Sequence, residues 1–344
     1  MVNPSQSGRR VLITGGAGYI GSHVARLMVD LGYDVTVLDI LRDQDGTGNR
    51  WAVPAKARFI HGSCGNRALL EELLPAGERF DAILHFAAYI LVDESVREPA
   101  KYYENNVVNS LRLFEYACET KVPSIIFSST AAVYGEAHSP LLAEDHAKAP
   151  VNPYGRSKLM SETMLRDMCA ASPATRYMAL RYFNPAGAHA SLEIGQARPH
   201  ASHLVNVAAE AAVGVRDKVM VYGSDYPTPD GTCLRDYIHI QDLADAHAVA
   251  LKYLENGGAS DAFNVGYGRP YSVREVIETM KQVSGMDFKV QIADRRIGDP
   301  ASLAADSTKI QRVLGWKPRH DSLREICESH YLWEKKRRET AALL

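Results

Sequence analysis

A glycine-rich turn between a short β-branched run and a helical segment constrains this chain more than any other feature. Residues Thr14–Gly21 read T-G-G-A-G-Y-I-G, directly after a predicted strand at Arg10–Thr14 and at the start of a predicted helix at Tyr19–Asp30. A second strand is predicted at Asp34–Asp39, where the sequence reads DVTVLD. A strand, a glycine turn, a helix and a second strand in this order predict the first βαβ unit of a dinucleotide-binding fold.

The three spaced glycines have separate tasks in such a turn. Gly15 permits the tight turn, Gly18 lets the backbone approach a pyrophosphate, and Gly21 lets the helix pack closely on the strand. The free N–H groups at the helix N-terminus then face the phosphates. Asp39 ends the second strand about 20 residues further on, where its carboxylate would accept hydrogen bonds from ribose hydroxyls. Because an aspartate repels the 2′-phosphate of NADP, the sequence predicts NAD as the cofactor.

Short apolar runs continue to alternate with helix-length segments through the first half of the chain. Hydrophobic residues make up 46% of the 344 residues, which is ample for a large core. Such alternation predicts an α/β fold with a doubly wound, mostly parallel, Rossmann-like sheet. The further strands are expected at Ala57–Ile60, Ala82–Phe86, Ser124–Ser128 and Tyr177–Tyr182, and the further helices at Pro99–Thr120 and Pro153–Ala171.

The regular alternation weakens after about Asn184, in a stretch rich in Ala, Gly and His. We therefore predict an NAD-binding domain over residues 1–184. Residues 185–344 are expected to form mainly a smaller, mixed α/β lobe that binds the substrate, with some segments returning to the first domain. Short strands are expected in this half at Val219–Val221 and Val290–Ile292, and helices at Gln241–Leu254, Ser272–Ser284 and Ser322–Arg338.

Charge and cysteine content argue against several classes of function. The chain has 39 Lys and Arg against 41 Asp and Glu, a net charge of −2, whereas nucleic-acid binders usually carry a basic excess. No apolar run reaches the roughly 20 residues that cross a bilayer, and residues 1–10 lack the apolar centre of a signal peptide. The cysteines number 5 and lack a C-x-x-C spacing, which indicates reduced thiols. We expect a cytoplasmic protein without a metal and without nucleic-acid or membrane partners.

Thr130, Tyr154 and Lys158 form a second group of candidate functional residues. Tyr154 and Lys158 are four residues apart in a predicted helix and therefore share one face. A phenol with a reference pKa of about 10 is a poor base at neutral pH, but a nearby ammonium and an oxidised nicotinamide would each lower that pKa. Thr130 lies just past a strand, at the edge where open α/β sheets bind ligands, and its hydroxyl can bridge the phenol and a substrate oxygen. The group predicts proton transfer beside the dinucleotide.

With these residues in this order, the chain resembles the extended short-chain dehydrogenase/reductase superfamily. Within it, the chain is most similar to the UDP-galactose 4-epimerase family, from Val11 to about Trp333. The shared stretches are TGGAGYIGSH at Thr14–His23, HFAA at His85–Ala88, YYENN at Tyr102–Asn106, Ser128–Gly135, PYGRSKLMSE at Pro153–Glu162, LRYFNPAGAH at Leu180–His189 and RDYIHIQDLADAH at Arg235–His247. The last two of these stretches, together with Asp225–Thr228 and Arg295–Asp299, are typical of nucleotide-sugar epimerases in particular.

The resemblance implies a reaction without net redox change. Tyr154 as a phenolate takes the O4 proton of a UDP-hexose while C4 gives a hydride to NAD, and the resulting 4-keto sugar turns before the hydride returns to its other face. The implied substrates are UDP-glucose and UDP-galactose, and the implied assembly is a homodimer packed through helices near Tyr102–Glu119 and Tyr154–Met168. The implied contacts to NAD are Gly15, Gly18, Tyr19, Ile20, Gly21, Asp39, Ser63, Cys64, Phe86, Ala87, Ala88, Asn105, Tyr154, Lys158 and Phe183. The implied contacts to the UDP-sugar are Thr130, Tyr154, Asn184, His203, Leu204, Met220, Val221, Tyr222, Arg235, Arg296, Asp299 and Leu303.

Three positions depart from the family pattern. Ser63 stands where many members carry an aspartate bonded to adenine, which predicts weaker retention of the cofactor. Ile90 replaces a lysine near the nicotinamide and leaves Lys158 as the main cation beside the phenol. Leu303 stands where some members place a tyrosine against C2 of the sugar. The smaller wall predicts that UDP-N-acetylhexosamines are also accepted.

Other activities on this scaffold stay open at this point. A 4,6-dehydratase or a UDP-glucuronate decarboxylase needs an acid after the strand-end hydroxyl residue, where this chain has Ala131 and Ala132. A catalytically silent NAD-binding sensor need not keep Thr130, Tyr154 and Lys158. A net-redox dehydrogenase, or another NAD-dependent nucleotide-sugar epimerase, would keep them all. Exchange of free NADH during turnover would separate the dehydrogenase from an epimerase.

Overall fold

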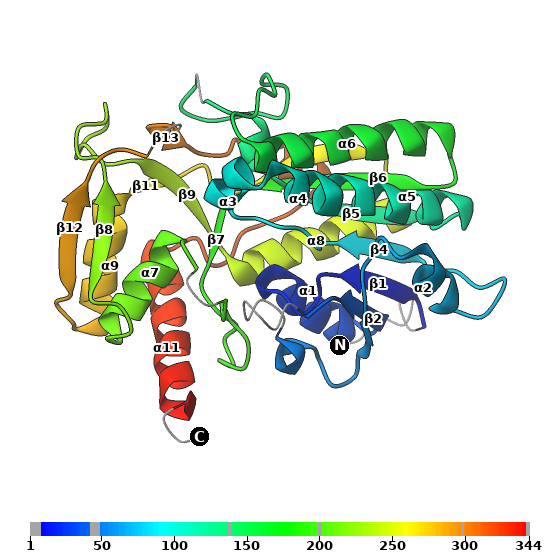
Figure 1. Cartoon of the computed structure of the whole chain (residues 1–344), viewed down its shortest axis with the longest axis horizontal. Coiled ribbons are helices and arrows are strands. Elements are labelled where there is room, and N and C mark those ends of the chain that lie inside the picture. The colour runs from blue at the N-terminus through cyan, green and yellow to red at the C-terminus, as the bar shows by residue number, and fades with distance from the viewer. Residues whose placement is uncertain (1–7, 42–48, 137–138, 199–200, 297–298, 342–344) are drawn as a thin grey trace.

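Parallel strands form the main sheet in the computed structural model of this protein, seen at the right of Figure 1. The structure describes residues 8–41, 49–136, 139–198, 201–296 and 299–341. Across these residues the sheet has 7 strands in the order β10-β6-β5-β4-β1-β2-β3, and every neighbouring pair is parallel. The predicted doubly wound, Rossmann-like sheet is therefore confirmed. Its strands are β1 (Arg10–Thr14), β2 (Asp34–Asp39), β3 (Arg58–His61), β4 (Ala82–His85), β5 (Ser124–Thr130), β6 (Arg176–Tyr182) and β10 (Asp261–Val265).

Alternation of side chains along each strand divides the apolar residues between the two faces of this sheet. In β1, Val11 and Ile13 pack into the core on one face, whereas Leu12 packs into the core on the other. Because helices cover both faces, the strands are nearly continuous apolar runs, as a buried parallel sheet requires. One face is covered by α1 (Tyr19–Asp30) and α8 (Ile240–Glu255), and the other by α2 (Arg67–Glu72), α5 (Asn109–Glu119) and α6 (Pro153–Ala171).

The helix predicted at Pro99–Thr120 is divided into pieces. α4 (Pro99–Tyr103) leads into a π-helical turn, η3 (Glu104–Val108), and α5 begins directly after it. A short helix that the sequence did not indicate, α3 (Val92–Arg97), precedes α4. A π turn changes the direction of the neighbouring side chains, and such turns are frequent at functional sites.

The smaller lobe, at the left of Figure 1, contains short sheets packed on helices. The predicted strands near residues 219–221 and 290–292 are found as β8 (Lys218–Tyr222) and β12 (Lys289–Ala293), which pair in parallel. A second short sheet joins β9 (Leu234–His239) to β7 (Asn184–Ala186), β11 (Pro270–Ser272) and β13 (Ser302–Leu303). The apolar core of the lobe lies among α7 (Leu204–Ala212), α9 (Val273–Ser284) and α11 (Leu323–Ala341).

Segments from the second half of the chain complete the main sheet. β10 pairs with β6, α8 packs against α1, and α10 (Thr308–Leu314) contacts both β10 and α8. The chain therefore passes from the sheet to the lobe and back, which brings residues of both parts to one edge of the sheet. Among the described helices, none has the length and apolar character that crossing a bilayer requires.

Candidate functional site

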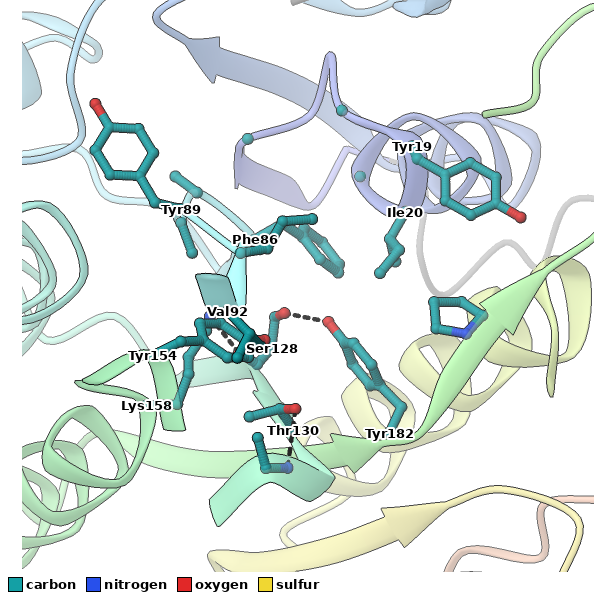
Figure 2. Close-up of a pocket in the computed structure, with 18 of the residues that line it drawn as sticks. Tyr19, Ile20, Phe86, Tyr89, Val92, Ser128, Thr130, Tyr154, Lys158 and Tyr182 are labelled. Atoms are coloured by element: carbon teal, nitrogen blue, oxygen red, sulfur yellow. Dashed lines mark hydrogen bonds between the residues drawn. The ribbon is translucent and has the colours of Figure 1, made fainter. Parts of the chain in front are cut away.

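The carboxyl ends of the central strands open onto a cavity of about 460 Å³. Residues at or just after the ends of β1, β4, β5 and β6 line it, and the smaller lobe supplies part of its wall. The strand order reverses between β1 and β4, because β2 and β3 lie on one side of β1 and β4 on the other. Such a switch point is where α/β sheets of this kind bind nucleotides. Figure 2 shows side chains from these strand ends directed into the cavity.

The turn after β1 has room only for glycine. A Cβ atom on Gly15 would lie 2.6 Å from the backbone nitrogen of Ala87, and one on Gly21 would lie 2.2 Å from the carbonyl oxygen of Gly15. Gly15 also has a φ of +73°, in the left-handed region that favours glycine. α1 begins directly after Gly18, which has no side chain to cap the first N–H groups of the helix. These N–H groups can bind the phosphates of a dinucleotide.

Asp39, at the end of β2, presents a carboxylate oriented by the backbone. Its Oδ2 accepts a hydrogen bond from the Ala17 amide at 3.0 Å, and its Oδ1 accepts one from the Leu41 amide at 3.0 Å. Burial raises the pKa of Asp39, and these backbone hydrogen bonds oppose the rise. Ser63 and Cys64, just after β3, also line the cavity, and the Ser63 hydroxyl accepts a hydrogen bond from the Gly65 amide at 3.1 Å. Together with the glycine turn, this carboxylate fits the pyrophosphate and ribose of NAD.

Every residue predicted to contact NAD lies in the cavity wall. These residues are Gly15, Gly18, Tyr19, Ile20, Gly21, Asp39, Ser63, Cys64, Phe86, Ala87, Ala88, Asn105, Tyr154, Lys158 and Phe183. The placement follows from the fold, because their segments come directly after parallel strands or begin the helices that follow them.

Thr130, Tyr154 and Lys158 come together on one side of the cavity (Figure 2). Tyr154 and Lys158 lie one turn apart on α6, which begins after the N-cap Asn152; the Asn152 side chain accepts a hydrogen bond from the Gly155 amide at 2.9 Å. Thr130 ends β5 beside the Tyr154 phenol, and its hydroxyl accepts a hydrogen bond from the Ala132 amide at 3.2 Å. Lys158 is 3% exposed, and its ammonium donates to the carbonyl oxygen of Ser128 at 2.8 Å.

Burial dominates the ionisation of this group. It lowers the pKa of Lys158 to about 7, and the Glu162 carboxylate, one helical turn further along α6, opposes that fall. Burial also raises the pKa of Tyr154 above its usual range, and the neighbouring Thr130 hydroxyl opposes that rise. The sequence-based expectation was that the ammonium lowers the phenol pKa, but burial is the larger effect, and Lys158 directs Nζ to a backbone carbonyl. An oxidised nicotinamide in the cavity would add a positive charge, which favours the phenolate.

Ser128 and Tyr182 also lie beside this group, although sequence reasoning did not select them. Their hydroxyls share a short hydrogen bond, drawn in Figure 2, and both residues line the cavity. Their positions at strand ends could have indicated them. Ser128 lies two residues before Thr130 on β5, and Tyr182 ends β6 directly before Phe183. Neighbouring parallel strands end at the same edge, so these side chains meet.

The π-helical turn η3 gives two consecutive asparagines different positions. Asn105 lines the cavity, whereas Asn106 is buried. Asn106 Oδ1 accepts from the Tyr89 amide at 2.8 Å, and its Nδ2 donates to the Ser157 hydroxyl at 3.1 Å. This asparagine therefore ties the loop after β4 to α6, next to Lys158.

The smaller lobe contributes part of the predicted substrate side. Asn184, His203, Arg235, Asp299 and Leu303 line the cavity, as does Thr130. Arg235 forms an ion pair with Asp299, and its Nη1 donates to the carbonyl oxygen of Leu234 at 2.7 Å. A diphosphate bound here would either share the Arg235 guanidinium with Asp299 or displace the Asp299 carboxylate from it.

Other residues predicted for the substrate side do not line this cavity. They are Leu204, Met220, Val221, Tyr222 and Arg296. Val221 is buried in the apolar core of the lobe, against which Leu204 also packs, and the Arg296 guanidinium lies 3.9 Å from the centroid of the Tyr222 ring. β8 pairs with β12, and its Val219 and Val221 side chains pack into the core of the lobe. Ile297 and Gly298, from the same predicted motif, lie outside the described residues.

Histidines buried in the neutral form should make the fold sensitive to acid. Burial lowers the pKa of His23, His239 and His330 to about 3 and that of His247 to about 4. The unfolded chain, with histidine pKa values near 6.5, binds more protons below that pH than the folded chain does. The contribution of these neutral histidines to the free energy of unfolding should therefore be fully present above about pH 6.5. It should fall as the pH decreases toward 4, by up to about 1.4 kcal/mol per pH unit for each histidine.

Urea denaturation at a series of pH values checks this expectation. His247 is the best position for a control, because its ring packs on Phe86 and Tyr182 and its Nε2 has no hydrogen-bond partner among the described residues. His247→Phe should reduce the pH dependence below pH 6.5. An unfolding free energy that stays constant between pH 6.5 and 5, or an equal slope in the variant, would contradict the assignment.

Comparisons with known proteins show the family of this chain. Residues 11–266 match the NAD dependent epimerase/dehydratase family. The UDP-glucose 4-epimerase of Azospirillum brasilense is 47% identical over 335 residues, which cover 97% of this chain and 94% of that protein. The structure is similar to that of the UDP-glucose 4-epimerase from Brucella ovis in complex with NAD, with a TM-score of 0.90, 40% identity and coverage of 95% and 98% of the two chains.

A further solved structure, the UDP-Glc/GlcNAc 4-epimerase from Campylobacter jejuni, is also similar. It is 48% identical with a TM-score of 0.83, and the match covers 96% of this chain and 100% of that one. The region that matches the family model includes the glycine turn, Asp39, Thr130, Tyr154 and Lys158. This chain belongs to the NAD-dependent epimerase/dehydratase family.

Proposed function

We propose that this protein is a UDP-glucose 4-epimerase that interconverts UDP-glucose and UDP-galactose with NAD held in the cavity. The observation that carries the proposal is the meeting of Thr130, Tyr154 and Lys158 in the same cavity as the glycine turn and residues of the smaller lobe. The names of the similar proteins from Azospirillum brasilense and Brucella ovis support it. Bound NAD would supply the acceptor and the donor of the C4 hydride.

The residues of the chain then have defined tasks. Gly15, Gly18 and Gly21 admit the pyrophosphate, and Asp39 binds the ribose hydroxyls. Tyr154 takes the proton from O4 as the hydride leaves C4, and it returns the proton once the sugar has turned. The Thr130 hydroxyl, which lies beside the phenol, holds O4 in line with it.

Lys158 acts on this proton transfer through its charge. Its ammonium lies one helical turn from Tyr154 and is fixed by the Ser128 carbonyl at 2.8 Å. A positive charge there favours the phenolate over the phenol. Ile90 is uncharged and lies in the cavity wall, so position 90 adds no positive charge there. Lys158 on α6 supplies the positive charge beside the phenol.

Elimination of water is disfavoured by the residues that follow Thr130. Ala131 and Ala132 begin the short helix η4 (Ala131–Val133) and line the cavity. Their methyl groups can neither donate nor accept a proton, so the wall lacks the acid that a 4,6-dehydratase needs at this point. The geometry therefore favours epimerisation over dehydration.

Incubation of the purified protein with UDP-galactose, without added NAD, tests the proposed function. We expect UDP-glucose as the product, with no net formation of NADH. Continuous consumption of NADPH, or a requirement for a stoichiometric oxidant, would instead indicate a net-redox dehydrogenase. Tyr154→Phe protein serves as the control for contaminating activity.

We further propose that the enzyme accepts UDP-N-acetylhexosamines. Leu303, on β13, lines the cavity beside Arg235, with which it pairs in the sheet, and it packs with Phe183. A leucine leaves space that a tyrosine would fill, and overpacking a closed site costs roughly 1–3 kcal/mol, about ten- to a hundredfold in rate. The similar Campylobacter jejuni protein is named for both UDP-Glc and UDP-GlcNAc, which supports a site of this size.

Leu303→Tyr tests this substrate range. The variant should lower kcat/KM for UDP-N-acetylgalactosamine by about tenfold or more relative to UDP-galactose, because the ring would occupy the space of the acetyl group. Leu303→Met, which conserves volume, is the matched control and should leave the ratio unchanged. If the ratio of the two kcat/KM values is the same in all three proteins, Leu303 does not control the range.

We also infer a homodimer formed through α4, α5 and α6, in the cytoplasm. Val96 on α3 and Met160 on α6 are large apolar side chains that are 62% and 45% exposed, and α3 contacts α6. Covering such neighbouring residues with a second copy would remove them from water. The free, mostly buried cysteines support a reducing compartment. Sedimentation velocity at micromolar concentration would show the mass of one chain if the dimer proposal is wrong.

A further inference from the structure

Residues 187–198, which follow β7, are held between two helices at the edge of the cavity. On one side, the Tyr19 hydroxyl of α1 donates to the Gly187 carbonyl at 2.7 Å. Figure 2 shows this tyrosine directed away from Tyr154, so its hydroxyl is occupied outside the reacting group. On the same side, Arg26 pairs with Glu193 at 2.9 Å. The segment is therefore fastened to the helix whose N-terminus faces the cofactor site.

The other side of the 187–198 segment is fastened to α11. The indole nitrogen of Trp333 donates to the Gln196 carbonyl at 2.6 Å, and Gln196 lines the cavity. The Trp333 ring is 5% exposed, and a Cβ atom on Gly195 would lie 2.6 Å from it. The ring and the segment are thus in direct contact, and the position of Trp333 determines the position of this part of the wall.

Trp51 reaches the same ring from the NAD-binding part of the chain. It lies in the short helix η2 (Arg50–Ala52) and stacks on Trp333, with 5.7 Å between the ring centroids and an angle of 26° between the planes. Asn49, two residues earlier, lines the cavity, and its amide donates to the Ala17 carbonyl at 3.3 Å. The stack therefore links a wall segment next to the glycine turn with the wall segment at Gln196.

The Trp51 side chain is not part of the buried core. The side chain is 54% exposed, whereas Ala52 and Val53, which follow it, are buried. Those buried residues keep the backbone in place when the indole is replaced. The stack can accordingly open and close without unpacking the main sheet.

We propose that the Trp51–Trp333 stack is a clasp that slows the release of NAD. While the rings are stacked, the wall segments at Asn49 and Gln196 stay joined, and the dinucleotide leaves when they separate. Offset aromatic stacking favours the joined state. The clasp gives this chain a means of retaining NAD although position 63 has a serine and no acidic side chain. The inference rests on NAD as the cofactor and not on the identity of the sugar.

Exchange of bound radiolabelled NAD against excess unlabelled NAD measures the release rate directly. Trp51→Ala should release NAD about tenfold faster than the unmodified protein, a change equivalent to about 1.4 kcal/mol. Trp51→Phe, which keeps an aromatic ring, should restore most of the slow release. Ile292→Ala, which removes an apolar side chain of 55% exposure from β12, should have no effect. Turnover in saturating NAD should stay within about twofold of the unmodified protein in every variant.

Two results would overturn the proposal. One is a release rate in folded Trp51→Ala protein, verified by its thermal unfolding midpoint, that equals the rate of the unmodified protein. The other is equally fast release from Trp51→Phe and Trp51→Ala, which would show that the ring itself is not required. If Trp51→Ala protein fails to fold, Trp51→Leu, which keeps apolar volume without a ring, takes its place in both comparisons. Because NAD release is measured without any sugar, failure of the proposed epimerase activity would leave this result interpretable.

Discussion

Replacing Tyr154 by phenylalanine should reduce the turnover of UDP-galactose by about 10²–10⁴-fold, the usual contribution of a positioned acid–base group. The phenol of Tyr154 lies beside Thr130 in the described wall, and Tyr154 is one helical turn from Lys158. Phenylalanine fills the same space, so the fold and the NAD content should not change. The measurement is kcat by coupled assay, together with NAD content after gel filtration.

Tyr182→Phe provides the matched control for this prediction. Tyr182 lines the same cavity and shares a hydrogen bond with the Ser128 hydroxyl, so the variant also removes one phenol oxygen from the wall (Figure 2). Its turnover should fall by about tenfold at most, because a hydrogen bond is lost but the base is kept. Comparable losses in the two variants, or more than half of the activity left in Tyr154→Phe protein, would show that Tyr154 is not the base.

The sheet and the glycine turn could be predicted because their signals are local. Val11, Leu12 and Ile13 form a continuous apolar run, as a strand covered on both faces must, and the φ of +73° at Gly15 favours glycine through the local backbone alone. The Thr130, Tyr154 and Lys158 group could be predicted in the same way. Tyr154 and Lys158 share a helix face, and Thr130 lies at the edge where parallel strands end.

What could not be predicted depends on residues far apart in the chain. β10 joins the sheet beside β6, but a strand of five residues does not indicate its partner. The pairing of β8 with β12 depends on distant segments in the same way, and Met220 and Tyr222 on β8 do not line the described cavity. The Trp51–Trp333 stack likewise arises only when η2 and α11 are brought together.

The direction of the Tyr154 pKa shift was also beyond the sequence. A lysine four residues away indicates a nearby charge, but the net shift depends on how deeply the phenol is buried and on where the ammonium points. In the structure Lys158 Nζ is bonded to Ser128 O, and burial is the larger effect on Tyr154. The π turn η3 likewise was not predicted, because the sequence of residues 99–120 indicates one continuous helix.

Glu162 and Arg181 form a buried ion pair behind the proton-transfer group. Arg181 donates from Nε to Glu162 Oε1 at 2.9 Å and from Nη2 to Oε2 at 2.6 Å, and the two residues are 5% and 7% exposed. The Ser129 hydroxyl, next to Thr130 on β5, also donates to Glu162. The same carboxylate raises the pKa of Lys158 against the effect of burial. Glu162 therefore links the stability of the fold to the charge of Lys158.

Glu162→Gln should lower the free energy of unfolding by about 3–5 kcal/mol, because it leaves the Arg181 guanidinium buried without its counter-charge. It should also lower the pKa of Lys158 below about 7, so that less of the ammonium form is present at pH 7 and turnover recovers as the pH is lowered. Asp167→Asn, on the same helix, removes the carboxylate of an ion pair whose side chains are 63% and 65% exposed and should cost less than about 1 kcal/mol. Urea denaturation and a pH–turnover profile measure both effects. Equal destabilisation by the two substitutions, or an unchanged profile in Glu162→Gln protein, would show that the buried carboxylate does not have this double role.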